Sequence, residues 1–97
     1  MKTIFFDKFG KPIIDVLEFE KLLSHKIIKQ DTLPDGKWVS TVWLGTDYSF
    51  GESGTPLIFE TMVFPKKYDF QDLDMQRYST LEEAKQGHEA MIKKYTN

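Results

Sequence analysis

The chain has 97 residues, 40% of them hydrophobic and none of them cysteine, and its 13 basic and 15 acidic side chains give a formal net charge of −2 at pH 7. This length favours a single domain over residues 1–97, and the lack of cysteine excludes disulfides, a cysteine nucleophile and cysteine-ligated zinc. A single arginine, Arg77, disfavours nucleic acid as a partner, and because no apolar run is long enough for a bilayer span or a secretory signal, we expect a cytoplasmic protein without a membrane partner.

The N-terminal part is predicted to form a short edge strand and a short helix. Residues 3–6 are apolar and favour a strand, and residues 7–12 contain the Gly and Pro of a turn. Asp15 followed by Glu18 is typical of a helix start, because an Asp side chain accepts a hydrogen bond from a free backbone N–H of the first turn. Apolar residues then recur at helical spacing, at Val16, Phe19, Leu22 and Leu23.

The middle of the chain is predicted to form a hairpin and then a strong strand. Residues 33–36 read Leu-Pro-Asp-Gly, which is a turn signal, and they separate a looser strand at 26–32 from a β-branched and aromatic strand at 37–44. A polar loop with three glycines covers residues 45–55. Residues 57–64 form the strongest predicted strand.

The last third is predicted to contain an Asp-rich loop at 66–74, a short strand at 75–78 and a helix. Either Ser79 with Glu82 or Thr80 with Glu83 would cap that helix in a capping box. Its apolar face would be Leu81, Ala84, His88, Met91, Ile92 and Tyr95. The predicted class is α+β, with a small antiparallel sheet of about four to five strands and both helices packed on one face.

Both faces of the predicted sheet are rich in apolar residues. In the strand at 57–64, Leu57, Phe59 and Val63 point to one side and Ile58, Met62 and Phe64 to the other, and the strand at 37–44 alternates in the same way. Two helices of this length cover one face. The second face therefore needs loops, another protein or a second copy of the chain, which would make a homodimer.

Three strings follow one another in the sequence: VSTVWLGTDYSF at 39–50, PLIFETMVF at 56–64 and RYSTLEEAKQGHEAM at 77–91. In these strings the chain resembles a family of small phage and prophage proteins without an established activity. The resemblance implies an accessory protein that acts in the cytoplasm of a bacterial host, and it carries over no catalytic residue.

Two loops concentrate aromatic and acidic side chains. Aromatic residues dominate contact energies at interfaces, and loops on a rigid scaffold often carry binding function. One interpretation is a docking surface, with an acidic rim that attracts a basic partner; the other is that these rings fold back and seal the ends of the sheet. The candidate residues are Tyr48, Phe50, Tyr68 and Phe70, with Asp47, Asp69, Asp72 and Asp74.

An alternative polar site consists of Glu60, Arg77 and His88. Glu60 lies mid-strand on the face of Ile58, Met62 and Phe64, so it is either paired with a cation such as Arg77 or Lys37, exposed at a rim, or raised in pKa. A small-ligand site would stack a planar ring on Trp43 or Tyr48 and hold an anion with Arg77. Asp47, Glu60 and His88 have the right types for a divalent metal, but their spacing does not predict one.

The function best supported by these patterns is a non-enzymatic binding module without a metal or cofactor. It would dock on a host protein and inhibit a defence or metabolic system. A nucleotide-like small-ligand binding or sequestering protein and a minor virion component are the alternatives. No nucleophile elbow and no phosphate-binding glycine loop occurs in the sequence.

Overall fold

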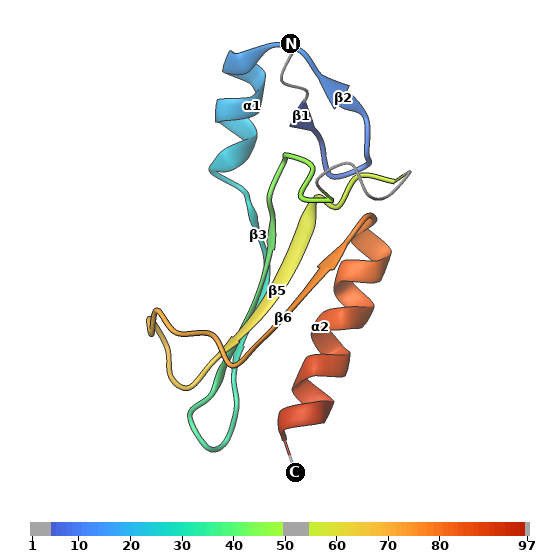
Figure 1. Cartoon of the computed structure of the whole chain (residues 1–97). Helices are drawn as coiled ribbons and strands as arrows, with labels where there is room; N and C mark the ends of the chain where they lie inside the picture. Colours follow the sequence, from blue (N-terminus) through green and yellow to red (C-terminus); the bar gives the residue numbers. More distant parts are fainter. Residues whose placement is uncertain (1–4, 50–54, 97) are drawn as a thin grey trace.

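A computed structural model describes residues 5–49 and 55–96 of the chain (Figure 1). It has the predicted α+β class, with two helices, a two-stranded sheet and a four-stranded antiparallel sheet. No helix in the described ranges has the length and apolar character needed to cross a membrane. The elements are β1 (Phe5–Phe6), β2 (Pro12–Ile13), α1 (Val16–Leu23), β3 (Ile27–Thr32), β4 (Trp38–Trp43), β5 (Phe59–Phe64), β6 (Asp74–Tyr78) and α2 (Leu81–Tyr95).

The main sheet is a simple meander with the strand order β3-β4-β5-β6, and every neighbouring pair is antiparallel. The predicted turn joins β3 to β4: the amide of Gly36 donates to the carbonyl of Leu33, and Gly36 has a φ of 96°, which glycine adopts readily. α2 lies along one face of this sheet, as Figure 1 shows. The opposite face carries no helix among the described residues.

The N-terminal strand differs from the prediction in its partner. β1 is not an edge strand of the main sheet; it pairs with β2, so that Phe5 lies opposite Ile13 and Phe6 opposite Pro12. The turn predicted within residues 7–12 joins β1 to β2, and in it the amide of Gly10 donates to the carbonyl of Asp7. β2 was not predicted from the sequence because it contains Pro12. Proline lacks a donor N–H and is therefore found in strands only at the edge of a sheet, which is where β2 lies.

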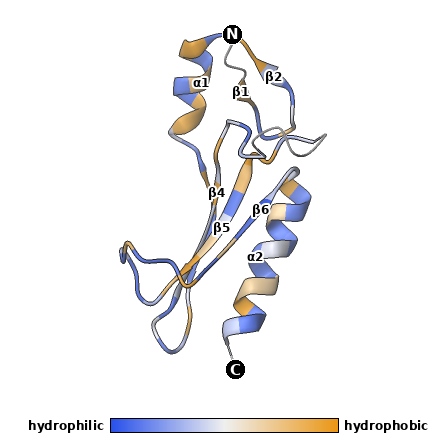
Figure 2. Cartoon of the chain, in the orientation of Figure 1, coloured by the Kyte–Doolittle hydropathy of each residue, from blue (hydrophilic) through white to orange (hydrophobic). Residues whose placement is uncertain are grey.

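The core forms between α2 and the sheet face that β4 and β5 present to it. Alternation along the strands brings Val39, Trp43, Phe59 and Val63 to this face, and each is at most 1% exposed. The buried residues of α2 are Ala84, His88 and Met91, which belong to the predicted apolar stripe. Figure 2 shows hydrophobic residues recurring along β5, whereas β6 is mostly hydrophilic.

α2 begins at a capping box formed by Thr80 and Glu83, one of the two predicted registers. The Thr80 hydroxyl accepts from the amide of Glu83, and the Glu83 carboxylate accepts from the amide of Thr80. α1 begins after Asp15, whose carboxylate accepts from the amide of Leu17. Both helix starts were therefore predicted correctly from the residue types.

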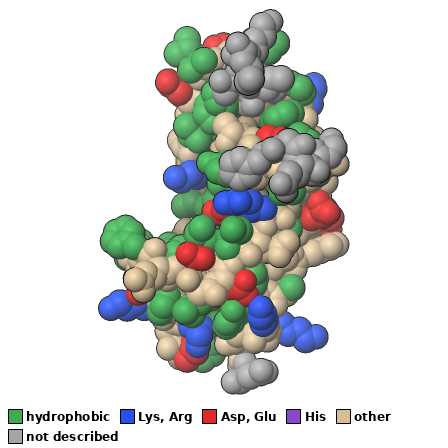
Figure 3. Space-filling view, in the orientation of Figure 1, with side chains coloured by type: hydrophobic (Ala, Val, Ile, Leu, Met, Phe, Trp, Pro, Cys, Tyr) green, Lys and Arg blue, Asp and Glu red, His purple; other side chains and the backbone are tan. Residues whose placement is uncertain are grey.

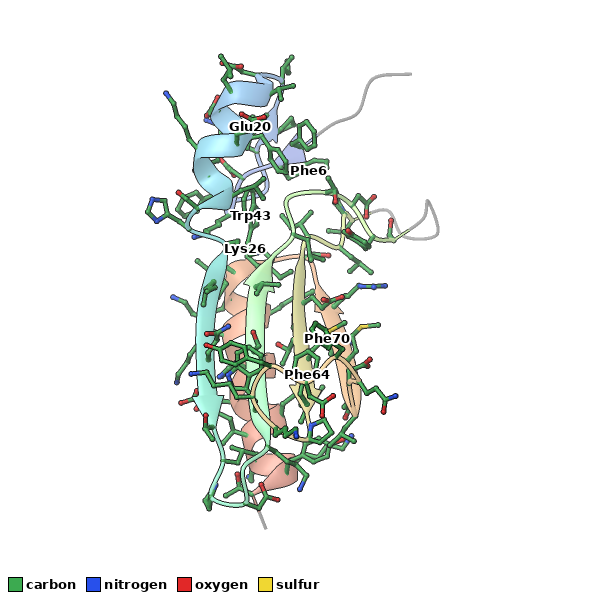
Figure 4. All side chains as sticks on the ribbon, turned by 90° about the vertical axis from the view of Figure 1, so that its left-hand side faces the viewer. Phe6, Glu20, Lys26, Trp43, Phe64 and Phe70 are labelled. Carbon is green, nitrogen blue, oxygen red and sulfur yellow. The ribbon has the colours of Figure 1, made fainter. Side chains whose placement is uncertain are left out.

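α1 and the small hairpin pack on the end of the main sheet through Trp43. The ring of Phe19 stacks on Phe5 at 3.9 Å and lies 5.7 Å from Trp43, whose indole N–H donates to the carbonyl of Phe6 at 3.0 Å. α1 has no fully buried residue, and Leu17 on it is 67% exposed. Aromatic contacts around Trp43, which Figure 4 shows near Phe6, therefore help to attach the N-terminal part, together with the buried Ile13 and the hydrogen bond from the amide of Phe6 to the carbonyl of Gly45.

Gly87 lets α2 approach β6 closely, and this gives a stability prediction. A Cβ at this position would overlap the ring and hydroxyl of Tyr78. Helix propensity alone favours Gly87→Ala by about 1 kcal/mol, but forcing the ring aside costs about 1–3 kcal/mol, so we expect a net loss in the free energy of unfolding. Urea unfolding measures it, with Gln86→Ala at the exposed neighbouring position as the control. Stabilisation by Gly87→Ala would show that Tyr78 does not pack there.

Candidate functional site

The sheet face opposite α2 carries the candidate site, which we call the open face. Its strand residues alternate with those of the core: Trp38, Ser40 and Val42 from β4, and Glu60, Met62 and Phe64 from β5. They line a shallow groove of about 270 Å³, bordered on β3 and before it by Lys26, Ile27 and Gln30. Ile58, which was predicted to share the face of Glu60, is instead buried in the cluster that contains Trp43.

The loop at residues 65–73 is ordered by its own hydrogen bonds. The amide of Asp69 donates to the carbonyl of Lys66, the Asp69 carboxylate accepts from the amide of Gln71, and the amide of Leu73 donates to the carbonyl of Val63. Tyr68 has a φ of 65°, in the left-handed region that bulky residues rarely occupy. Such strain persists only where surrounding contacts impose it. These hydrogen bonds and the left-handed backbone of Tyr68 define the arrangement of the loop.

This arrangement places aromatic rings on the open face. The ring of Trp38 lies 5.5 Å from Phe64 on one side and 5.5 Å from Tyr68 on the other. Tyr68 is nevertheless 74% exposed, and Phe70, two residues on, is 98% exposed. Figure 4 shows Phe70 and Phe64 on the side of the sheet away from α2, and Figure 3 shows hydrophobic side chains protruding at the edge where this loop lies. The ring of Tyr68 thus packs on Trp38 of the sheet, while the ring of Phe70 is exposed to solvent.

A polar group occupies the other end of the open face. Glu60 and Arg77 are register partners on β5 and β6, and the Arg77 guanidinium donates from Nε to the Glu60 carboxylate at 3.1 Å. Glu60 is 9% exposed, and of the alternatives that the sequence leaves open the pair with Arg77 is the one that the structure forms. The guanidinium also lies 5.0 Å from the centre of the Tyr48 ring. Lys37, the other predicted partner of Glu60, pairs with Asp35 instead.

The acidic candidates have separate roles. Asp47 ties its loop together, because its carboxylate accepts from the amides of Ser49 and Leu57. Burial of the carboxyl raises its pKa, but these hydrogen bonds outweigh burial and leave the pKa of Asp47 below its usual 3.8, so the stabilisation they give is lost as the pH falls through that lowered pKa. Asp72 is exposed, and Phe50 lies outside the described residues.

The predicted acidic rim is not formed as expected. Asp74 lies on the α2 side of β6, where its carboxylate accepts from the Lys94 ammonium at 2.7 Å and from the Tyr95 hydroxyl at 2.8 Å. The loop that holds Asp69 and Asp72 also holds Lys66 and Lys67. The charges of these two basic and two acidic residues cancel, so the loop has no net negative charge that would attract a basic partner over a long range.

His88 lies on the opposite side of the sheet, fully buried beneath α2. Its Nδ1 is 2.6 Å from the Thr41 hydroxyl, which is 2.6 Å from the Thr61 hydroxyl, and its Nε2 is 2.7 Å from the Asp31 carboxylate. A hydroxyl, an imidazole and a carboxylate in this order occur in nucleophilic enzymes. Here Thr41 is fully buried and its hydroxyl is enclosed by Thr61 and His88, so a substrate carbonyl cannot reach it. This series of hydrogen bonds joins α2 to the sheet.

The structure therefore groups the candidate residues differently from the docking surface, the polar site and the metal site considered from the sequence. Tyr48, Tyr68, Phe70, Glu60 and Arg77 belong to the open face, whereas His88 does not. The metal trio of Asp47, Glu60 and His88 is not brought together, because Asp47 holds its loop and the other two lie on opposite faces of the sheet.

Trp43 cannot stack on a ligand, since it is 1% exposed and packs in the core. Alternation along β4 puts Trp38 and Trp43 on opposite faces of the sheet, but nothing local in the sequence shows which face α2 covers. No protein-family model, curated protein or solved structure matches this chain.

Proposed function

We propose that this protein is a non-enzymatic binding module that docks on another protein through the open face and the loop at residues 65–73. The observation that carries the proposal is the presentation of Phe70: an almost fully exposed phenyl ring on a loop that is fixed by hydrogen bonds and by the packing of Tyr68 on Trp38. An aromatic side chain held rigidly in solvent loses little freedom on binding and is typical of an interface anchor.

The shape of the open face favours a protein over a small molecule as the occupant. Small ligands are usually enclosed over most of their surface, whereas the groove of about 270 Å³ is shallow and Phe70 stands outside it. A partner with an apolar projection for the groove and a hollow for Phe70 would use both features. The polar groups suit such a partner, because the Glu60–Arg77 pair is already neutralised within the chain.

The resemblance to small phage and prophage proteins points to a bacterial host protein, of a defence or metabolic system, as the partner to be inhibited. A capture experiment with three baits tests the proposal: the wild-type protein, Phe70→Ser, and Phe9→Ser as a matched control. Phe9 is 85% exposed on the turn between β1 and β2, away from the open face. We expect one stoichiometric host protein on the wild-type and Phe9→Ser baits and a strong loss on Phe70→Ser.

Equal recovery on all three baits would contradict the proposal, and so would retention of a small molecule without a protein. Sedimentation of the purified chain tests the homodimer alternative. A stable dimer that Phe70→Ser dissociates would make a second copy, rather than a host protein, the occupant of the open face.

A further inference from the structure

Three metal-ligating side chains converge where β3 meets α2, on the side of the sheet away from the open face. The Asp31 carboxylate, the His88 imidazole and the Glu89 carboxylate each offer one atom, and these atoms lie within 4.8 Å of one another. His88 contributes from the buried side of α2, while Asp31 is partly buried and Glu89 is exposed. The cluster therefore sits at the boundary between core and solvent.

The imidazole of His88 is already oriented as metal-ligating histidines are. Its Nδ1 is held by the Thr41 hydroxyl, which is itself held by Thr61, so Nε2 is aimed at the carboxylate of Asp31. Metal-bound histidines commonly have their second ring nitrogen fixed by such a hydrogen bond, which sets the tautomer. Because the hydroxyls of Thr41 and Thr61 can rotate, these hydrogen bonds also accommodate the His88 tautomer with its proton on Nδ1. That tautomer leaves the Nε2 lone pair for a metal.

A cation already occupies the mouth of the cluster. The ammonium of Lys29 donates to the Glu89 carboxylate at 2.8 Å and lies 3.9 Å from the Asp31 carboxylate. A hollow of about 300 Å³ beside it, lined by Ile28, Lys29, Lys85 and Glu89, leads to solvent. The two carboxylates thus attract positive charge at a position that solvent can reach.

We propose that Asp31, His88 and Glu89 form a binding site for a divalent transition-metal ion such as Zn²⁺, with the side chain of Lys29 displaced when the ion enters. One imidazole and two carboxylates suit zinc, and three protein ligands leave a fourth position for water. Tetrahedral zinc separates its ligand atoms by roughly 3.3 Å. Nε2 of His88 and the Asp31 carboxylate are 2.7 Å apart, so the partly exposed Asp31 carboxylate has to move slightly away from the buried imidazole when the ion enters. The exposed Glu89 side chain can rotate to supply the third ligand atom.

Zn²⁺ titration of the chelator-treated protein tests this site, by calorimetry and by NMR of the imidazole nitrogens. We expect one ion per chain, a large shift of the His88 Nε2 signal, and at least about tenfold weaker binding in Glu89→Gln. Lys29→Gln should bind about two- to fivefold more tightly, because a competing cation is removed. These variants change exposed side chains, which avoids the unfolding expected of His88 substitutions.

Two controls separate this site from adventitious binding. Glu82→Gln changes an exposed acid elsewhere on α2, and His25→Gln removes the only other histidine; both should bind Zn²⁺ as the wild type does. Unchanged His88 signals at saturating Zn²⁺, wild-type affinity in Glu89→Gln, or loss of binding in His25→Gln would each overturn the proposal.

Discussion

Trp43→Ala is expected to lower the free energy of unfolding by about 3–5 kcal/mol, the usual loss when a large buried aromatic side chain is removed. Trp43 is 1% exposed, contacts Phe19 of α1, and donates its indole N–H to the carbonyl of Phe6. Its removal creates a cavity and also removes contacts with Phe19 and Phe6 that help to hold the N-terminal part on the main sheet. Urea unfolding followed by far-UV circular dichroism measures the loss.

The other tryptophan provides the matched control. Trp38 is half-buried on the open face and packs only against Phe64 and Tyr68 among its ring contacts. Trp38→Ala should therefore cost about 1–2 kcal/mol, because less apolar surface leaves contact with neighbours. Equal losses for the two substitutions would mean that the faces of the sheet are wrongly assigned.

Phe70→Ala is expected to weaken binding to the captured partner by about 1–3 kcal/mol, or roughly 5- to 150-fold, without changing the melting midpoint. The ring is 98% exposed in the free protein, so its removal costs the fold almost nothing. Isothermal titration of the partner with wild type, Phe70→Ala and Phe9→Ala measures the difference. If Phe70→Ala lowers the melting midpoint so far that the variant is partly unfolded during the titration, its weaker binding would reflect a loss of folded protein. Phe70 would then support the fold rather than the interface.

The association rate should depend only weakly on salt. Lys66 and Lys67 offset Asp69 and Asp72 within the same loop, and Arg77 is paired with Glu60, so the surface presents little net charge to a distant partner. A steep fall of the association rate between low and physiological ionic strength would instead restore the steering role first expected of the acidic residues.

Most elements of this fold, β2 excepted, could be predicted because their signals are local. The capping box at Thr80, the Pro34-Asp35-Gly36 turn and the β-branched strands each lie within a few residues of sequence. Alternation also separated Trp38 from Trp43 correctly. The choice of the covered face was beyond this reasoning, because both faces are apolar and the contact of α2 with β4 and β5 joins residues far apart in the chain.

The candidate site was predictable only in part, for the same reason. Tyr68 and Phe70 were found because aromatic residues in a polar loop are conspicuous, but the left-handed backbone of Tyr68 that positions them has no sequence signal in a residue other than glycine or asparagine. The hydrogen bond between His88 and Asp31 spans 57 positions. Residues so far apart in the chain are not related by any helical or strand periodicity. The apolar face of α2 therefore predicted the place of His88, but nothing in the sequence predicted its partners Thr41 and Asp31.

The two tryptophans allow a direct test of whether a partner protein binds the open face. Trp38 lies on that face beside Phe64 and Tyr68, and Trp43 lies in the core behind the sheet. Fluorine NMR of the 5-fluorotryptophan-labelled protein would follow both residues during titration with the unlabelled partner. We predict a shift or broadening of the Trp38 resonance, with the Trp43 resonance unchanged as the internal reference. A Trp38 resonance that stays fixed at saturation with the partner would contradict docking on the open face.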